Sequence, residues 1–287
     1  AFVFQTKLAD MPLQTRLRRA AHDVADRRFA IADDAHTGWI LTEGGTAVSC
    51  EKESRSQRES RDGPDQSKRL LTEESPFAIR EAYVKLRTSL LFCMTADKER
   101  PCSTFAVTSA KPSEGKSLTA ANIAISYAML GKRVLLVDAD MRRAGQRSLW
   151  SVRSSAGLCD FFAKISRLEL MKVTDLPLWI VCTGTIPPNP SELLSSERMR
   201  RFAAESAETY DYVIIDTPPI NTVADAQIIS TYVDGVVLVT RSGVTTTDEL
   251  NDAMDAVLRA GGNLCGVVLN DMNMKSGKYA HKHKKNA

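Results

Sequence analysis

The segment AKPSEGKS, residues 110–117, combines residue types that suit phosphate chemistry. Between an apolar run and a helical stretch, Gly115, Lys116 and Ser117 would offer backbone N–H groups, a cation and a hydroxyl to a phosphate group. We expect Lys116 to reach the terminal phosphates of ATP and the Ser117 hydroxyl to bind Mg²⁺. Ala110 replaces the first Gly of the G-x-x-x-x-G-K-[ST] pattern, so a coincidental match is the alternative. The residues expected to bind the nucleotide in this loop are Lys111, Ser113, Glu114, Gly115, Lys116, Ser117 and Leu118.

Three carboxylates follow two apolar runs further along the chain. VLLVDAD ends in Asp138 and Asp140, and YVIIDTP contains Asp216, so all three lie at the carboxyl ends of expected strands, where open α/β sheets bind ligands. Taken alone, each acid could simply cap the following helix. Three acids beside a phosphate-binding loop are better explained by Mg²⁺ binding and by orientation of an attacking group, because phosphoryl transfer depends on positioning and charge neutralisation.

Six short apolar runs must form the strands that position these groups. Runs that are apolar on both faces suit strands covered by helices on both sides, as in a parallel sheet. Helices are expected near residues 117–130, 191–207 and 246–260. The succession predicts an α/β fold with a doubly wound, mostly parallel sheet flanked by helices, the architecture of P-loop NTPases. The runs are TFAVTSA (104–110), VLLVDAD (134–140), LWIVCTG (178–184), YVIIDTP (212–218), GVVLVTR (235–241) and LCGVVLN (264–270).

The composition divides the chain into three parts. Residues 1–74 form an unassigned N-terminal segment whose second part, EKESRSQRESRDGPDQSKRLLTEE (51–74), is too charged and too poor in core residues to offset the entropy of ordering, so we interpret it as a linker. Residues 75–271 form the expected P-loop domain. Residues 272–287 are expected to be a flexible basic tail with one tyrosine.

The bulk numbers restrict the class of partner. A formal charge of +3, from 38 basic and 35 acidic residues, is too small to indicate nucleic-acid binding, and we expect no nucleic-acid partner. No run approaches the roughly 20 apolar residues of a membrane span, and the start, AFVFQTKLAD, lacks the apolar core of a signal peptide, so a cytoplasmic protein is expected. Six cysteines without C-x-x-C spacing are interpreted as reduced thiols.

The combination of SAKPSEGKS, LLVDADMRR and VIIDTPP resembles the three Walker motifs of bacterial protein-tyrosine kinases, within the deviant-Walker ATPases. The stretches 75–90, 184–196, 216–227 and 233–246 resemble the same branch, and the likeness covers residues 74–279 but not the first seventy or so. The resemblance implies a kinase domain over residues 75–271 that autophosphorylates tail tyrosines between neighbouring subunits of a ring, and thereby regulates capsular or extracellular polysaccharide production. It also implies an activator, the cytoplasmic tail of a membrane polysaccharide co-polymerase, and a cognate tyrosine phosphatase. The expected location is the inner face of the cell membrane, reached through that activator.

The resemblance also assigns roles to residues. Lys116 and Ser117 match the phosphate-binding Lys and the Mg²⁺-binding hydroxyl, and Lys116, Asp138 and Asp140 are the expected catalytic groups. Sequence leaves open which of Asp138 and Asp140 accepts the tyrosine proton; Asp138 is our choice, with Asp216 nearer the metal. The expected metal ligands are Ser117, Asp138 and Asp216. Asn270 matches a strand-end Asn near the purine, although a plain turn or cap is an equal alternative.

Two segments depart from the family pattern. The ring-forming pattern E-x-x-R-x-x-R is represented by Glu81, Val84 and Arg87, with Lys85 beside the missing Arg, so Glu81, Lys85 and Arg87 are the expected oligomer interface in a ring that this change would weaken. A solvated, salt-bridged helix face is the alternative. In the tail KSGKYAHKHKKNA (275–287), where the family has several tyrosines, Tyr279 is the only phosphoacceptor candidate.

Two other functions compete with the kinase. A partitioning or septum-site ATPase would use ATP to switch dimerisation, but such proteins have Lys-Gly-Gly in this loop, whereas here Pro112 and Ser113 follow Lys111. A non-catalytic nucleotide-binding partner of a co-polymerase would suit the loss of tail tyrosines.

Overall fold

A nine-stranded sheet forms the centre of the computed structural model, which describes residues 36–41, 47–52, 69–94, 103–152 and 156–273. The order of the strands is β2-β1-β9-β8-β3-β7-β4-β6-β5. The six strands from β9 to β6 in this order run parallel, while β5 and the β1–β2 pair are antiparallel additions at the two edges. The strands are β1 (His36–Leu41), β2 (Ala47–Lys52), β3 (Ser103–Ser109), β4 (Val134–Asp138), β5 (Met171–Lys172), β6 (Leu178–Val181), β7 (Tyr212–Asp216), β8 (Gly235–Arg241) and β9 (Leu264–Asn273).

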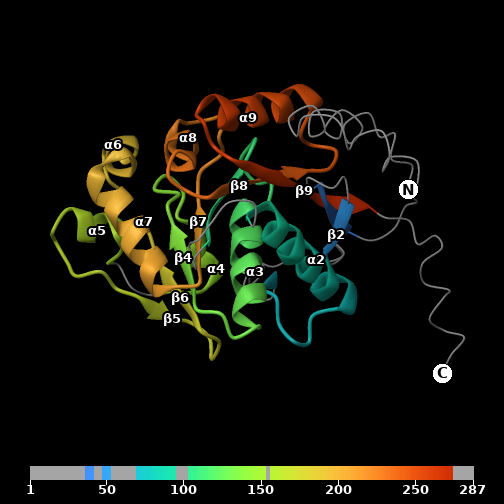
Figure 1. Ribbon diagram of the computed structural model, residues 1–287, viewed down its shortest axis with the longest axis horizontal. Coiled ribbons are helices and arrows are strands. Elements are labelled where there is room, and N and C mark those ends of the chain that lie inside the picture. Colours follow the sequence, from blue (N-terminus) through green and yellow to red (C-terminus); the bar gives the residue numbers. More distant parts are fainter. Residues whose placement is uncertain (1–35, 42–46, 53–68, 95–102, 153–155, 274–287) are drawn as a thin grey trace, which may run out of the picture.

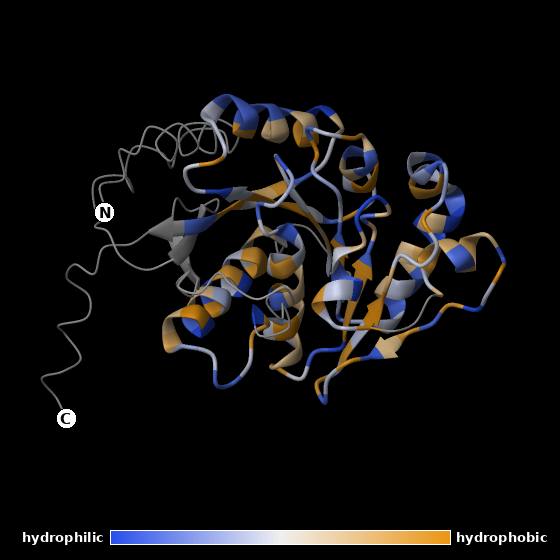
Figure 2. Cartoon of the chain, turned by 180° about the vertical axis from the view of Figure 1, so that it is seen from behind, coloured by the Kyte–Doolittle hydropathy of each residue, from blue (hydrophilic) through white to orange (hydrophobic). Residues whose placement is uncertain are grey.

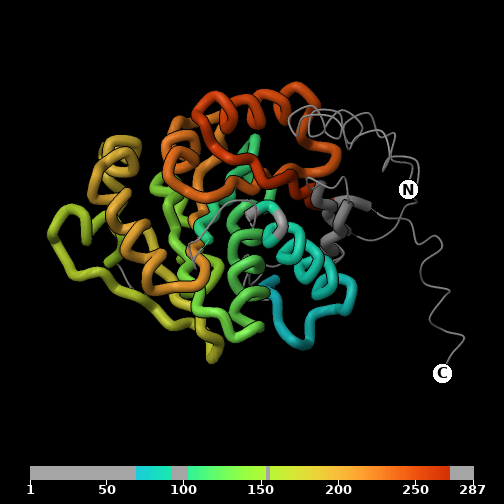
Figure 3. The backbone as a smooth tube through the Cα atoms, viewed as in Figure 1, coloured from blue at the N-terminus to red at the C-terminus, as the bar shows by residue number. Residues whose placement is uncertain are grey.

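Helices cover both faces of this sheet, as Figure 1 shows for α2 and α3 on one side and α8 and α9 on the other. The colours of Figure 2 place the apolar strands at the centre and polar residues on the outward helix faces. Figure 3 follows the chain from the yellow segment around β5 at one end of the molecule to the red β9 toward the other. The helices are α2 (Phe77–Met94), α3 (Lys116–Ala128), α4 (Gly145–Leu149), α5 (Leu158–Phe162), α6 (Pro190–Ser195), α7 (Glu197–Thr209), α8 (Asp225–Ser230) and α9 (Thr247–Arg259).

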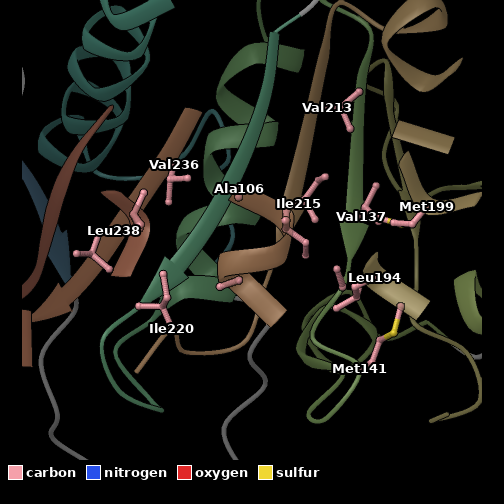
Figure 4. Close-up of a cluster of buried hydrophobic side chains, with 14 of the residues drawn as sticks. Ala106, Val137, Met141, Leu194, Met199, Val213, Ile215, Ile220, Val236 and Leu238 are labelled. Carbon is pink, nitrogen blue, oxygen red and sulfur yellow. The ribbon is translucent and has the colours of Figure 1, made fainter. Parts of the chain in front are cut away.

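The alternation of side chains along the strands divides the core into two layers. Phe105 and Val107 of β3 pack with α2 and α3 on one face, whereas Ala106 of the same strand belongs to the cluster under α7, α8 and α9. Figure 4 shows this second cluster, in which Val137 and Ile215 from adjacent strands lie near Met199 of α7. Each fully buried aliphatic side chain contributes about 1.5–3 kcal/mol through burial. The doubly wound fold is therefore confirmed, and it is held from both sides.

Register within the sheet brings the polar ends of the strands together. Asp138 of β4 pairs directly with Asp216 of β7, and Val107 of β3 pairs with Asp216 on the other side. Because β3 leads into the loop 110–115, the loop and both acids meet at the carboxyl edge of the sheet. All six predicted strands are present, and their alignment places the predicted site.

Several elements differ from the expectations. The expected helix over 191–207 is two helices, α6 and α7, because Ser196 is extended (φ −67°, ψ 150°) and its side chain accepts a hydrogen bond from the Met199 N–H. β1 and β2 lie within residues 1–74, which the sequence left unassigned, and β2 includes the first two residues of the expected linker. β9 extends to Asn273, two residues into the expected tail.

Candidate nucleotide and catalytic site

The loop between β3 and α3 has the backbone shape of an anion-binding site. Ser113 (φ 66°) and Gly115 (φ 92°) are both left-handed, as in the nests of N–H groups that bind phosphate, and α3 begins at the next residue, Lys116. A Cβ on Gly115 would lie 2.4 Å from the Asn270 Nδ2, so no larger residue fits at this position. The residues present therefore fit a nucleotide phosphate.

Lys116 is surrounded by carboxylates at this edge of the sheet. Its Nζ lies 2.7 Å from Asp140 Oδ2 and 3.3 Å from Asp216 Oδ1, and it donates to Ser117 Oγ at 3.1 Å. Burial alone would lower the pKa of Lys116, but the charges of Asp216 and Asp140 raise it above the ordinary value for lysine. The side chain is thus a cation held at the point where three of the predicted site residues meet.

The two acids that follow β4 have different surroundings. Asp140 Oδ1 accepts backbone N–H groups of Arg142 (3.3 Å) and Arg143 (2.9 Å), while its Oδ2 is paired with Lys116. Asp138 accepts only backbone N–H groups among its printed partners, from Asp140 (3.3 Å) and from Gln146 (3.0 Å). Burial, together with the neighbouring Asp216 charge, raises the pKa of Asp138 well above its ordinary value. A carboxylate with a raised pKa is the better proton acceptor near neutral pH.

The loop after β8 clamps the opposite side of the phosphate-binding loop. The Glu114 carboxylate is buried; it accepts the Lys111 N–H at 2.7 Å and the Thr245 hydroxyl. Burial raises the pKa of Glu114 despite these hydrogen bonds, which lower it. Lys111 Nζ also forms an ion pair with Glu249 Oε1 at 2.7 Å, and this hydrogen bond lowers the pKa of Glu249 to about 2.

Asn270 lies at the end of β9 beside this loop, as the sequence predicted for it. Its Nδ2 donates to the Glu114 backbone carbonyl at 2.9 Å and lies 3.4 Å from Thr119 Oγ1. The side chain therefore holds the loop backbone and the first turn of α3 in place.

The predicted ligands fit Mg²⁺ bound together with phosphates. Within the described part of the chain, no group of three or more His, Cys, Asp or Glu side chains is placed to hold a metal ion by itself. Mg²⁺ is usually bound through one or two carboxylates, substrate phosphates and waters rather than by an all-protein cage. Ser117 and Asp216, which both contact Lys116, with Asp138 beside them, are suited to that kind of site.

Other predicted residues lie away from this site or outside the described residues. Glu81, Lys85 and Arg87 are on α2; Lys85 is exposed, but the Arg87 guanidinium donates to the Ser126 backbone carbonyl of α3. Tyr279 lies outside the described residues.

Three residues that contact the site carry no sequence signal. Gln146, Thr245 and Glu249 match no motif, because their partners come from segments that are distant along the chain. Only the fold brings Gln146 to Asp216, 70 residues away.

Comparison with known proteins identifies the family. A family model described as an AAA domain matches residues 102–257. The chain is 40% identical over 205 residues to tyrosine-protein kinase YwqD of Bacillus subtilis (strain 168), a match that covers 71% of this chain and 83% of that protein.

Solved structures agree with this match. The kinase domain of the Escherichia coli tyrosine kinase ETK superposes with a TM-score of 0.64 at 34% identity, covering 68% of this chain and 76% of that one. The chimerical protein CapA2B2 gives a TM-score of 0.65 at 32% identity, with 70% and 88% covered. In the residues that the structure describes, no helix has the length and apolar character that crossing a bilayer requires. With its phosphate-binding loop and strand-end acids in the arrangement described above, the chain belongs to the bacterial protein-tyrosine kinase family of P-loop ATPases.

Proposed function

We propose that this protein is an ATP-dependent protein-tyrosine autokinase that regulates the synthesis and export of capsular or extracellular polysaccharide. The observation that carries the proposal is the meeting of Lys116, Asp138 and Asp216 beside the phosphate-binding loop. The membership of the chain in a kinase family supports it, as do relatives named as tyrosine-protein kinases, one of them from a cps region.

Each residue has a role that follows from its contacts. Lys116 binds the terminal phosphates and offsets the negative charge that develops on the transferred group. Ser117 and Asp216 hold Mg²⁺, which neutralises phosphate charge when it is bound. Asp140, fixed by two backbone N–H groups, orients Lys116. Asp138 accepts the proton of the tyrosine hydroxyl as its oxygen bonds to the γ-phosphorus and ADP leaves.

The acceptor and the partners belong to the same proposal. Tyr279 is the principal phosphoacceptor, presented to a neighbouring subunit in a ring to which Glu81 and Lys85 contribute. The activator is the cytoplasmic tail of a membrane co-polymerase, which would bring the kinase to the inner face of the membrane, and a cognate phosphatase removes the phosphate. The likeness to the chimerical protein CapA2B2 is consistent with a partner segment bound to this fold.

Labelled ATP with Mg²⁺ tests the proposal directly. The parent chain, incubated with and without an activator peptide, is expected to yield phosphotyrosine on phosphoamino-acid analysis. Lys116→Met should lower the rate by about 100-fold or more, because it removes a charge-stabilising group from the transition state. The exposed Lys132→Met variant is the matched control and should keep the parental rate. Release of phosphate without phosphotyrosine would identify an ATPase switch, and neither product would identify a nucleotide-binding partner.

A further inference from the structure

Gln146 is a fully buried polar side chain at the start of α4, between the phosphate-binding loop and the strand-end acids. Its Nε2 donates to Asp216 Oδ2 and to the Ser117 backbone carbonyl, both at 2.9 Å. Its backbone N–H donates to Asp138 Oδ2 at 3.0 Å. One residue thus contacts all three residues that are expected to bind Mg²⁺.

Trp150 fixes the orientation of the Gln146 amide. The indole Nε1 donates to Gln146 Oε1 at 3.0 Å, and an indole N–H can only donate. The oxygen of the amide must therefore face Trp150, and the NH₂ group must face Asp216 and Ser117, which both present acceptors. The assignment of the amide follows from the chemistry of its neighbours.

The contact divides the Asp216 carboxylate between two partners. Oδ1 faces Lys116 at 3.3 Å, and Oδ2 is held by Gln146. Because Gln146 is neutral, it satisfies Oδ2 without removing the negative charge that a cation requires. The close packing extends to the neighbouring residue, since a Cβ on Gly145 would lie 2.8 Å from Ser117 Oγ.

We propose that Gln146 is a positioning residue that fixes Asp216 relative to Ser117 and so sets the affinity of the nucleotide-bound protein for Mg²⁺. The inference rests on the proposed function, because it takes Ser117 and Asp216 as the metal-binding pair. Residues that orient metal ligands from behind commonly change metal affinity or activity about 10- to 100-fold when they are mutated.

The test is Mg²⁺-dependent binding of a fluorescent ADP, which does not require activity. In Gln146→Met, which keeps similar volume without donors, the Mg²⁺ concentration at half-maximal enhancement should rise about 10- to 100-fold. ADP binding in EDTA should stay close to that of the parent, because the loop 110–117 keeps its backbone contacts. Gln227→Met, a half-buried glutamine on α8, is the matched control and should leave the Mg²⁺ midpoint unchanged.

Trp150→Phe provides a second variant should Gln146→Met fail to fold. It retains the amide but frees its oxygen, and the Mg²⁺ midpoint should rise roughly 2- to 10-fold, as expected for the loss of one hydrogen bond. A folded Gln146→Met protein with a parental Mg²⁺ midpoint would overturn the inference, and so would a parental midpoint in Trp150→Phe if only that variant folds. Asp216→Asn separates the two hypotheses: loss of Mg²⁺ enhancement in Asp216→Asn but not in Gln146→Met leaves the proposed function intact.

Discussion

Asp138 and Asp216 are buried acids paired across adjacent strands, and their proximity sets the chemistry of the site. Two like charges in a buried region disfavour ionisation of one another unless cations or N–H groups offset them. Lys116 offsets the charge of Asp216 and Asp140, while Asp138 is contacted by backbone N–H groups. The environment therefore distinguishes a proton acceptor from acids that pair with cations.

The rate of tyrosine phosphorylation should depend on pH through Asp138. Its raised pKa places the acid limb well above the 3.8 of ordinary Asp, and activity falls as pH falls because the protonated acid cannot accept the tyrosine proton. Initial rates of phosphotyrosine formation across roughly pH 5 to 9 measure this limb. Asp140→Asn should keep the limb at a lower rate, whereas Asp138→Asn should lose nearly all activity. A normal limb in Asp138→Asn would transfer the role of base to another group.

The sequence could predict the residues of this site that belong to contiguous motifs. Lys116, Ser117 and the three acids follow from a loop between strand and helix and from apolar runs that end in Asp. Gln146 could not be found this way, because its importance lies in hydrogen bonds to residues 29 and 70 positions away. Thr245 is similar: it reaches Glu114 only because β8 lies beside β3.

Elements were predictable where burial or length gave a clear pattern. The inner strands are apolar on both faces, and α3 and α9 are long enough to be anticipated. α4, α5 and α8 have only five or six residues, too few to establish a helical period. The break between α6 and α7 depends on the Ser196 cap, for which the Ser-Ser-Glu sequence was the available signal.

Helix α2 contains one expected interface residue that also holds the fold together. The Arg87 guanidinium donates to the Ser126 carbonyl, so Arg87→Ala should lower the free energy of unfolding by about 1–2 kcal/mol, typical of a charged hydrogen bond that is partly exposed. Lys85→Ala, on the exposed face, should change it by less than about 0.5 kcal/mol. Urea denaturation measures both values, and light scattering shows whether Lys85→Ala lowers the oligomer mass. Equal stability of the two variants would contradict the α2–α3 contact.

At the scale of the whole molecule, the sheet is wider than the sequence indicated. β1 and β2 pair antiparallel beyond β9, although their residues, HTGWIL and AVSCEK, form no continuous apolar run. A short edge hairpin depends on backbone pairing with its neighbour rather than on a two-faced apolar pattern, so composition alone did not reveal it. The central strands, and hence the site at their carboxyl ends, do not depend on that edge.

Residues 275–287 give the remaining prediction, because they join a single tyrosine to five lysines and no acid. A basic segment should be attracted to a site lined by Asp138, Asp140 and Asp216, and phosphate on Tyr279 would reverse that attraction. Mixing Lys116→Met, which keeps Tyr279 but lacks activity, with active Tyr279→Phe should place phosphotyrosine on the Lys116→Met chain, identified by a size tag and mass spectrometry. Labelling should fall as salt is raised, since exposed charges are screened. The double variant Lys116→Met, Tyr279→Phe should stay unlabelled in the same mixture. An unlabelled Lys116→Met chain, under conditions where the parent labels itself, would show that transfer occurs within one chain; label on the double variant would place the acceptor elsewhere.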